Sequence, residues 1–130
     1  MEMALLAPWV VFLFIGAFDW GFYAYSLISI ENATRTAAGY IAAQNDTTQI
    51  TTANACSAVL PELSSLPNIG TAMTTCTSAP LIVSASQITS VDGQPAVQVN
   101  LTYTTPQLIP IPGLLAGQFT ITRVVKMRAT

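Results

Sequence analysis

An uncharged apolar run at the N terminus constrains the fold of this chain more than any other stretch of its sequence. From Met3 to Phe18 there is no charged residue, and after the single Asp19 the apolar character continues to Ile30. As a helix rising about 1.5 Å per residue, the stretch from Met3 to Ile30 would measure roughly 40 Å, which exceeds the ~30 Å hydrocarbon core of a bilayer. The sequence therefore predicts a membrane-spanning helix.

Three residues distinguish this segment from an ordinary membrane anchor, namely Glu2 and Pro8 near its start and Asp19 in its middle. A carboxylate near the centre of a spanning helix costs about 2.5 to 3.5 kcal/mol on insertion scales. We therefore expect Asp19 to have a partner, for which packed neighbouring helices are a source, or to be protonated. The alternative is that Asp19 caps or snorkels. Pro8 removes a backbone donor, which is tolerated in the first turns of a helix.

A cleaved signal peptide is the alternative explanation of an apolar N terminus. It requires a basic start, a shorter apolar core and a small-residue cleavage site. Neither Lys nor Arg precedes the apolar run, and Ser29-Ile30-Glu31-Asn32 continues into further helix without an A-x-A-like site. We therefore expect the segment to be retained in the mature protein.

The helix is predicted to continue beyond Ile30 with a more polar pattern. Glu31 and Arg35 stand at i and i+4 in the order that supports a helix, which fits a surface pair worth a few tenths of a kcal/mol. Asn45 and Asp46 favour leaving the helix. This half should lie against a globular head through one apolar face, formed by Leu27, Ile30, Ala33, Ala37, Tyr40 and Ile41.

The order of these features carries a resemblance to a known family. Glu2 precedes the run MALLAP, then come bulky apolar residues, Gly16 and Asp19, and finally the sequence NATRTAAGYIA from Asn32. Residues 1–43 thereby resemble the TadE/TadG-like family of type IV pilin-like proteins of the Tad-type pilus. The family's leader ending in Gly does not precede this segment, and Glu2 lies closer to the first residue than the family's acid does. Either the numbering starts at a shifted position or processing differs.

The resemblance implies a subunit that is held in the inner membrane before assembly. Its implied partners are copies of itself in a helical homopolymer, a prepilin peptidase and the pilus assembly machinery. Its implied location is the cell surface, as part of an extracellular filament (a fimbrium). The resemblance also implies that the Glu2 carboxylate neutralises the terminal amine of a neighbouring subunit inside an apolar core. Opposite charges attract far more strongly in low dielectric than in water, and an unpaired charge there is severely penalised.

Composition allows at most one compact domain beyond the helix. Of the 130 residues, 8% are charged, against about 25% in a typical globular domain, and the mean hydropathy is +0.54. These values argue against a freely soluble monomer. The net charge of -2, without any polybasic segment, argues against nucleic acid as a partner.

The two cysteines, Cys56 and Cys76, are predicted to form a disulfide, because an even pair in a domain outside the cytoplasm favours one. Closing a loop of this length stabilises a domain by roughly 3 kcal/mol in the chain-entropy model. A metal site or a reactive thiol is the alternative, but neither His nor clustered acids support it. Cys56 lies in a predicted short helix that Pro61 and Pro67 close.

Beyond Cys76 the sequence follows the pattern of β-strands. Leu81 to Ile88 is rich in β-formers, Val91-Asp92-Gly93-Gln94 indicates a tight turn, and Pro95 begins the next strand or lies on an edge. Apolar residues alternate with polar ones in two further strands, at Val97, Val99, Leu101 and Tyr103 and at Phe119, Ile121, Val125 and Met127.

These elements predict an α+β, type IV pilin-like fold in which the long N-terminal hydrophobic helix packs on a small antiparallel β-sheet head. The helix is expected over 1–43, with an apolar membrane or filament-core half at 1–30 and a head-packing half at 31–43. The head is expected over 44–130, with the short helix, the disulfide loop and a three-stranded sheet.

Two further segments are candidate contact surfaces between subunits. The stretch from Pro106 to Gly117 is apolar yet rich in strand breakers, and TadE-like chains are similar in carrying a Pro- and Leu-rich loop here. Such a loop marks a contact surface or folds back on its own sheet. The basic C-terminal residues form inter-subunit pairs or are solvated strand positions, since exposed pairs contribute about 0 to 1 kcal/mol. The residues concerned are Leu108, Ile109, Ile111, Leu114 and Leu115 in the loop and Arg123, Lys126 and Arg128 in the strand.

The sequence shows no catalytic arrangement. It has no His, no Gly-rich phosphate loop, no closely paired carboxylates and no metal-binding cluster, so we expect neither an enzyme nor a cofactor. The predicted function is that of a structural subunit, a pilin, which polymerises through its N-terminal helix. Two alternatives stay open: a TadE-like minor pilin that primes or tips a filament of another subunit, and a membrane-anchored extracellular binding module.

Overall fold

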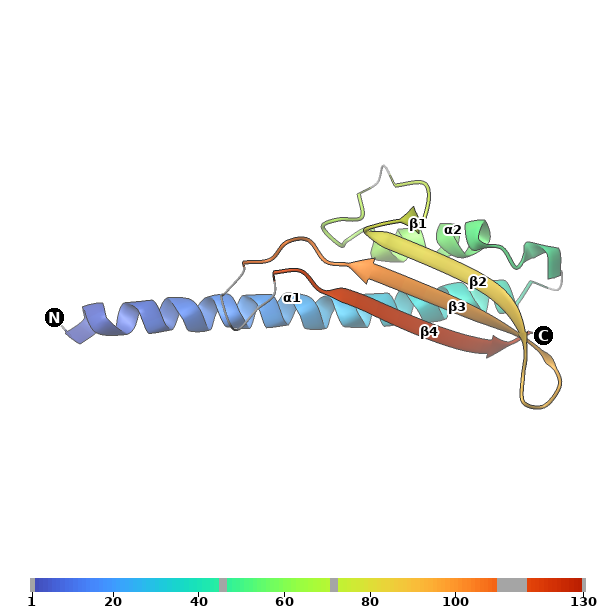
Figure 1. Cartoon of the computed structure of the whole chain (residues 1–130), viewed down its shortest axis with the longest axis horizontal. Coiled ribbons are helices and arrows are strands. Elements are labelled where there is room, and N and C mark those ends of the chain that lie inside the picture. The colour runs from blue at the N-terminus through green and yellow to red at the C-terminus, as the bar shows by residue number, and fades with distance from the viewer. Residues whose placement is uncertain (1, 45–46, 71–72, 110–116, 130) are drawn as a thin grey trace.

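The fold is built on the long helix α1 (Glu2–Ala42), and the head lies against the C-terminal half of this helix (Figure 1). The computed structural model describes residues 2–44, 47–70, 73–109 and 117–129 of the chain. This is the predicted α+β, pilin-like arrangement. The other elements follow in the order η1 (Thr47–Gln49), α2 (Thr52–Leu63), β1 (Thr77–Ser78), β2 (Leu81–Thr89), β3 (Pro95–Thr104) and β4 (Thr120–Arg128).

The N-terminal half of α1 is a helix with apolar side chains all round. The helix is 41 residues long and passes through Pro8 without a break. Pro8 lies near the helix start, so its missing N–H removes one backbone bond close to an end that already has unpaired donors. Every residue from Leu5 to Phe14 is exposed, whichever side of the helix it occupies. By length and composition the helix can cross a membrane, as an all-round apolar helix does.

The C-terminal half of α1 packs on the head through mostly small side chains. Thr34 satisfies its hydroxyl by donating to the carbonyl oxygen of Ile30 at 2.6 Å. Tyr40, which its spacing had placed on the buried face, is 50% exposed, because a step of about 100° per residue turns it to the side of that face. The buried face consists of Ile30, Ala33, Thr34, Ala37, Ala38, Ile41 and Ala42.

The sheet has four antiparallel strands in the order β1-β2-β3-β4. The three predicted strands are all present, with β3 paired along its length to β2 and β4. The additional strand β1 pairs Thr77 with Ile82 and Ser78 with Leu81. A strand of two residues has no alternating pattern, so it could not be predicted from the sequence. The apolar row that was predicted for β3 is buried, at Val97, Val99, Leu101 and Tyr103.

The short helix α2 covers the core beside β2 and is tied to the chain beyond it. Thr51 caps the helix by accepting a hydrogen bond from the backbone N–H of Asn54 at 3.2 Å. The helix runs through Pro61 to Leu63, past the residue predicted to end it. Pro61 lies in the last turn, where its missing N–H costs only one bond.

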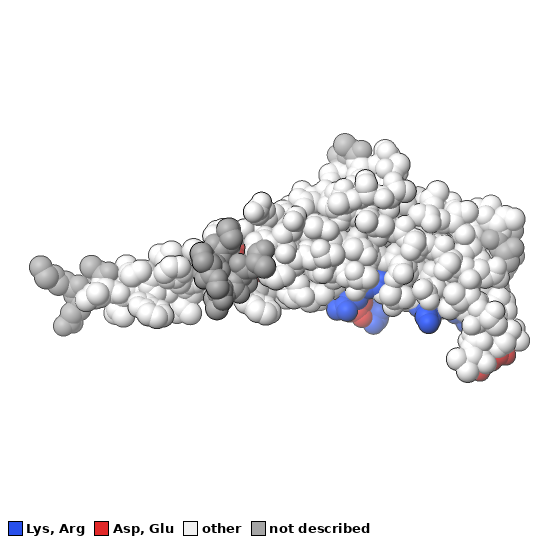
Figure 2. Space-filling model, in the orientation of Figure 1, with Lys and Arg blue, Asp and Glu red and all other residues white. Residues whose placement is uncertain are grey.

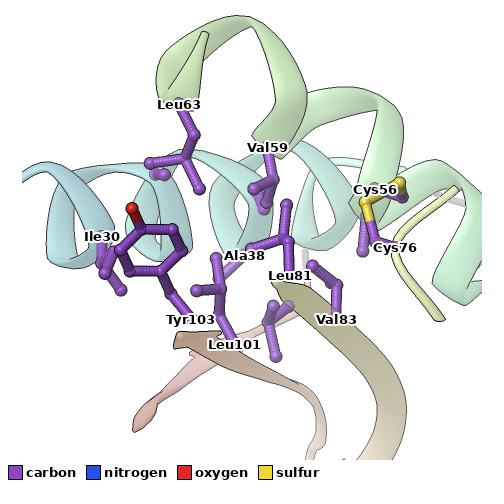
Figure 3. Packing of buried hydrophobic residues seen from close by; sticks show 14 of the residues in the cluster. Ile30, Ala38, Cys56, Val59, Leu63, Cys76, Leu81, Val83, Leu101 and Tyr103 are labelled. Carbon is purple, nitrogen blue, oxygen red and sulfur yellow. A yellow bond between two sulfur atoms is a disulfide. The ribbon is translucent and has the colours of Figure 1, made fainter. Parts of the chain in front are cut away.

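A disulfide joins α2 to the residue just before β1, as predicted. Cys56 and Cys76 are bonded, with their Cα atoms 5.7 Å apart. Both cysteines are buried at the edge of the core that α1, α2 and the sheet share (Figure 3). The crosslink therefore fastens the loop between α2 and β1 to the same core that holds the head on α1.

Tyr103 is the largest wholly buried side chain of this core. Its ring packs among apolar residues of α1, α2 and β2 (Figure 3). Its hydroxyl has no hydrogen-bond partner among the residues that the structure describes. Burial raises the pKa of Tyr103 to about 12, because the phenolate would lose its hydration in the core.

Tyr103 should make the head sensitive to alkaline pH. Its pKa is raised from 10.0 to about 12, so its stabilising contribution is complete below pH 10 and is lost as the pH rises towards 12. The free energy of unfolding should fall by about 2 to 3 kcal/mol over that interval. Urea unfolding of the full chain in detergent, followed by circular dichroism at stepped pH, measures this fall.

The Tyr103→Phe variant should lose this pH dependence and keep its stability at neutral pH, because the deleted hydroxyl has no partner among the described residues. Tyr40→Phe is the matched control, since Tyr40 is half exposed and its removal should leave the alkaline loss in place. An equal alkaline loss in Tyr103→Phe and in the wild type would contradict the assignment.

Candidate assembly surface

The projecting half of α1 exposes a continuous run of large apolar side chains. Phe14 and Leu5 are 75% and 77% exposed, and the sequence has no charged residue between Leu5 and Phe18. Figure 2 shows the described part of this half as almost entirely uncharged. Monomeric soluble proteins rarely expose such a surface, so it requires lipid or another apolar surface. The exposed residues are Leu5, Leu6, Trp9, Val10, Val11, Phe12, Leu13, Phe14, Phe18 and Trp20.

Asp19 interrupts this surface as a buried acid. Only 2% of its surface is exposed, whereas Phe18 and Trp20 on either side are 63% and 64% exposed. Neither carboxylate oxygen has a hydrogen-bond partner among the residues that the structure describes. Asp19 lies in the middle of α1, so it does not cap a helix end. A buried carboxylate without a hydrogen-bond partner is costly.

The other two predicted assembly residues lie at the start of the helix. Glu2 is the first residue of α1, and its side chain lies outside the part of the chain that the structure describes. Pro8 is exposed within the apolar half. The three candidates are therefore spread along one helix and do not form a compact site within a single chain.

An aromatic contact marks the point where the apolar half of α1 meets the head. The ring of Tyr23 lies 5.3 Å from that of Phe119, just before β4, and 6.0 Å from that of Trp20 in an edge-on arrangement. Aromatic pairs at such distances contribute about 0.5 to 1.5 kcal/mol beyond their buried area. This contact ties the start of β4 to the helix.

The predicted contact loop is closed at its base by backbone bonds. The N–H of Leu108 donates to the carbonyl oxygen of Gly117 at 2.6 Å, and that of Thr105 donates to Phe119 at 2.9 Å. Leu108 is half-buried and Ile109 is 52% exposed. The remaining loop candidates, Ile111, Leu114 and Leu115, lie outside the described residues.

The basic residues of β4 lie on both faces of that strand. Arg123 stands opposite Leu101 in the row that faces α1, whereas Lys126 and Arg128 stand opposite Gln98 and Ala96 in the outer row. All three side chains are exposed. None of them forms an ion pair with a described residue, since the salt bridge found in that part of the chain joins Glu31 and Arg35. The period of two in the predicted row of Phe119, Ile121, Val125 and Met127 includes residue 123, so Arg123 is a charged residue within the inner row.

The helix and the edge strand enclose an open cleft of about 480 Å³. We call it the basic cleft. The cleft brings Arg35 next to β4. The sequence analysis had paired Arg35 only with Glu31. No local pattern could reveal this, because it depends on how α1 and β4 are placed side by side. Figure 2 shows basic side chains gathered on this face of the head. The cleft is lined by Glu31, Arg35, Arg123, Val124, Val125 and Lys126.

The described residues offer no group of three His, Cys, Asp or Glu side chains that could hold a metal ion. Both cysteines are used in the disulfide.

A model of a protein family described as TadE-like protein matches residues 1–39. This segment is the one on which the resemblance rested, and the match confirms it. The family is pilin-like and generally non-enzymatic. The chain matches none of the curated proteins and none of the solved structures with which it was compared.

Replacing Asp19 should stabilise the isolated subunit. The Asp19→Leu variant removes a buried carboxylate that has no hydrogen-bond partner among the described residues, so the free energy of unfolding in detergent should rise by about 1 to 3 kcal/mol. Urea unfolding followed by circular dichroism measures the change. Glu62→Leu, at an exposed acid of α2, should give no such gain. A loss of stability in Asp19→Leu would mean that the carboxylate has a favourable partner within the subunit.

Proposed function

Since residues 1–39 match the model of the TadE-like family, we propose that the protein is a pilin, the structural subunit of a Tad-type, type IV pilus-like extracellular filament. The observation that carries the proposal is the contrast along α1. Its C-terminal half completes the core of the head, whereas its N-terminal half exposes apolar side chains all round. A second copy of the same helix offers a matching surface for it.

Assembly would transfer this half from one apolar surrounding to another. Before assembly α1 spans the inner membrane, as its length and composition permit. In the filament, neighbouring helices replace the lipid and the heads form the outer wall. Helices packed in this way gain dispersion contacts and exclude water. Apart from its ends and the bond that Pro8 removes, the backbone of α1 is bonded within the helix, so the transfer requires no change in its secondary structure.

The carboxylates of α1 would set how neighbouring helices are placed. Glu2 would neutralise the terminal amine of a neighbouring subunit, and Asp19 would receive a donor from an adjacent helix. Neither oxygen of Asp19 has a partner among the described residues, and Asp19 is covered within its own subunit, so a donor from a neighbouring helix would reach it only when the side chains around it move. An ion pair in an apolar core stabilises only the arrangement of helices in which both charges meet. Pro8 would shape the first turns of the helix.

The head would add contacts around this core. The loop residues Leu108 and Ile109, together with Ile111, Leu114 and Leu115, would pack on a neighbouring subunit. The basic residues of β4 would pair with acids of another copy. The partners of the chain would then be further copies of itself, a prepilin peptidase and the assembly machinery, with no nucleic acid, cofactor or catalytic role.

The composition of sheared and pelleted surface material tests the proposal. The dominant protein should have the intact mass of this chain starting at or just before Met1, with two hydrogens missing for the disulfide when no reductant is used. Recovery of a small amount within filaments of another protein would instead identify a minor pilin. Recovery only from membranes would identify an anchored extracellular module and would contradict the filament.

A charge placed on the exposed apolar half of α1 should prevent polymerisation. Phe14→Asp puts a carboxylate where the side chain is 75% exposed in the subunit and would be buried in the filament, at a cost of several kcal/mol. The pelleted fraction should fall by about tenfold or more, with the subunit retained in membranes. Ile82→Asp, on the outer face of the sheet where Ile82 is 44% exposed, should polymerise normally. Unimpaired filaments of Phe14→Asp would exclude this half from the core.

A further inference from the structure

The hairpin between β2 and β3 ends in a tight and rigid turn. The N–H of Gly93 donates to the carbonyl oxygen of Ser90 at 2.9 Å, and the N–H of Ser90 donates to that of Gln94 at 2.8 Å. Gly93 has a φ of 75°, which glycine adopts without strain. These bonds fix residues 90–94, which we call the hairpin tip. In Figure 1 this tip projects beyond the sheet and beyond the C-terminal end of α1.

The hairpin tip presents an apolar residue and an acid side by side. Val91 is completely exposed, at 104%, and Asp92 is exposed next to it. Figure 2 shows acidic atoms on the surface at this end of the molecule. The second position of such a turn accepts most residues, so the turn itself does not require a valine there. The pair is better explained by a contact outside the subunit.

The basic cleft is complementary to the tip in charge and in apolar character. Three cations and one carboxylate line it, so its net charge is 3 − 1 = +2. The carboxylate, Glu31, is already bonded to Arg35, which leaves Arg123 and Lys126 without an ion pair among the described residues. Val124, also at the cleft, is 50% exposed. An acid beside a valine thus finds both a cation and an apolar side chain there.

Asp92 forms no ion pair within the described part of its own chain, where the salt bridge found joins Glu31 and Arg35. The hairpin tip and the basic cleft are distinct parts of the head that adjoin at Lys126, since Val91 of the tip and Lys126 of the cleft also line one pocket within the same chain. A contact between two different surfaces of identical copies is heterologous, and it extends into an open helical filament when the rotation does not close. A contact of this kind suits a polymer.

We propose that the hairpin tip of one subunit docks in the basic cleft of the next, with Asp92 facing Arg123 and Lys126 and Val91 packing on Val124. This inference rests on the proposed function, because it places the contact between the heads of neighbouring subunits in the filament. It gives the basic residues of β4 a specific partner, namely the acid at residue 92 of another copy.

Charge reversal on each side of the contact tests the inference. Asp92→Lys and Arg123→Glu should each lower the pelleted fraction of sheared filaments by about threefold to tenfold, because each replaces an attraction with a repulsion. Glu62→Lys is the matched control, since it reverses an exposed acid on α2 and should leave the pelleted fraction unchanged. The wild-type fraction should also fall as salt is raised.

Co-expression of the two variants provides the decisive measurement. In an alternating filament each reversed tip meets a reversed cleft and each natural tip meets a natural cleft, so the mixture should pellet as well as the wild type. A charge pair within one chain cannot give this rescue. Single variants that pellet normally, or a mixture that stays impaired, would overturn the contact. If the wild-type chain forms no filament, that result would contradict both the proposed function and this inference.

Discussion

The structure depends on one helix that meets two different surroundings along a continuous backbone. The face of α1 around Ala33, Ala37 and Ala38 is buried under the sheet and α2, and its small side chains allow the strands to approach the helix axis closely. The half from Leu5 to Phe14 is exposed and finds no cover in the described part of the head. The head therefore has a closed apolar core, whereas the N-terminal half of α1 leaves its apolar side chains uncovered.

Asp19 lies where the two halves of α1 meet. On its N-terminal side the apolar side chains are exposed, and on its C-terminal side Ser26, Ile30 and later residues are buried. The contact of Tyr23 with Phe119 is close by, so the end of the head's packing and the unpartnered acid coincide along the helix. A polar group at such a boundary can be satisfied by a neighbouring subunit without being drawn into the middle of the apolar half. This position makes an acid tolerable there.

The parts of the fold that follow from local patterns were predictable from the sequence, and those that depend on pairing between distant elements were not. The apolar run identified α1, the alternation of Val97, Val99, Leu101 and Tyr103 identified a strand with one buried face, and the cysteine pair was found. The strand β1 was not predicted, because it exists only through its pairing with β2. At the assembly surface, the residue types of Asp19 and β4 were recognised. The burial of Asp19 and the meeting of Arg35 with Arg123 depend on tertiary packing.

Because charged residues are few, each one would contribute more to the register between subunits of the proposed filament. Only 8% of the residues are charged, and apolar helices can slide or rotate against one another with little change in buried area. Apolar contacts thus favour association but specify register weakly, whereas a charge that must meet its partner excludes most alternative arrangements. Asp19 lies in the middle of α1 and Asp92 in the turn between β2 and β3, and in Figure 1 these two parts of the chain lie at opposite ends of the head. Two such points separated along the subunit would fix both the axial shift and the rotation between neighbours, which a single contact could not do.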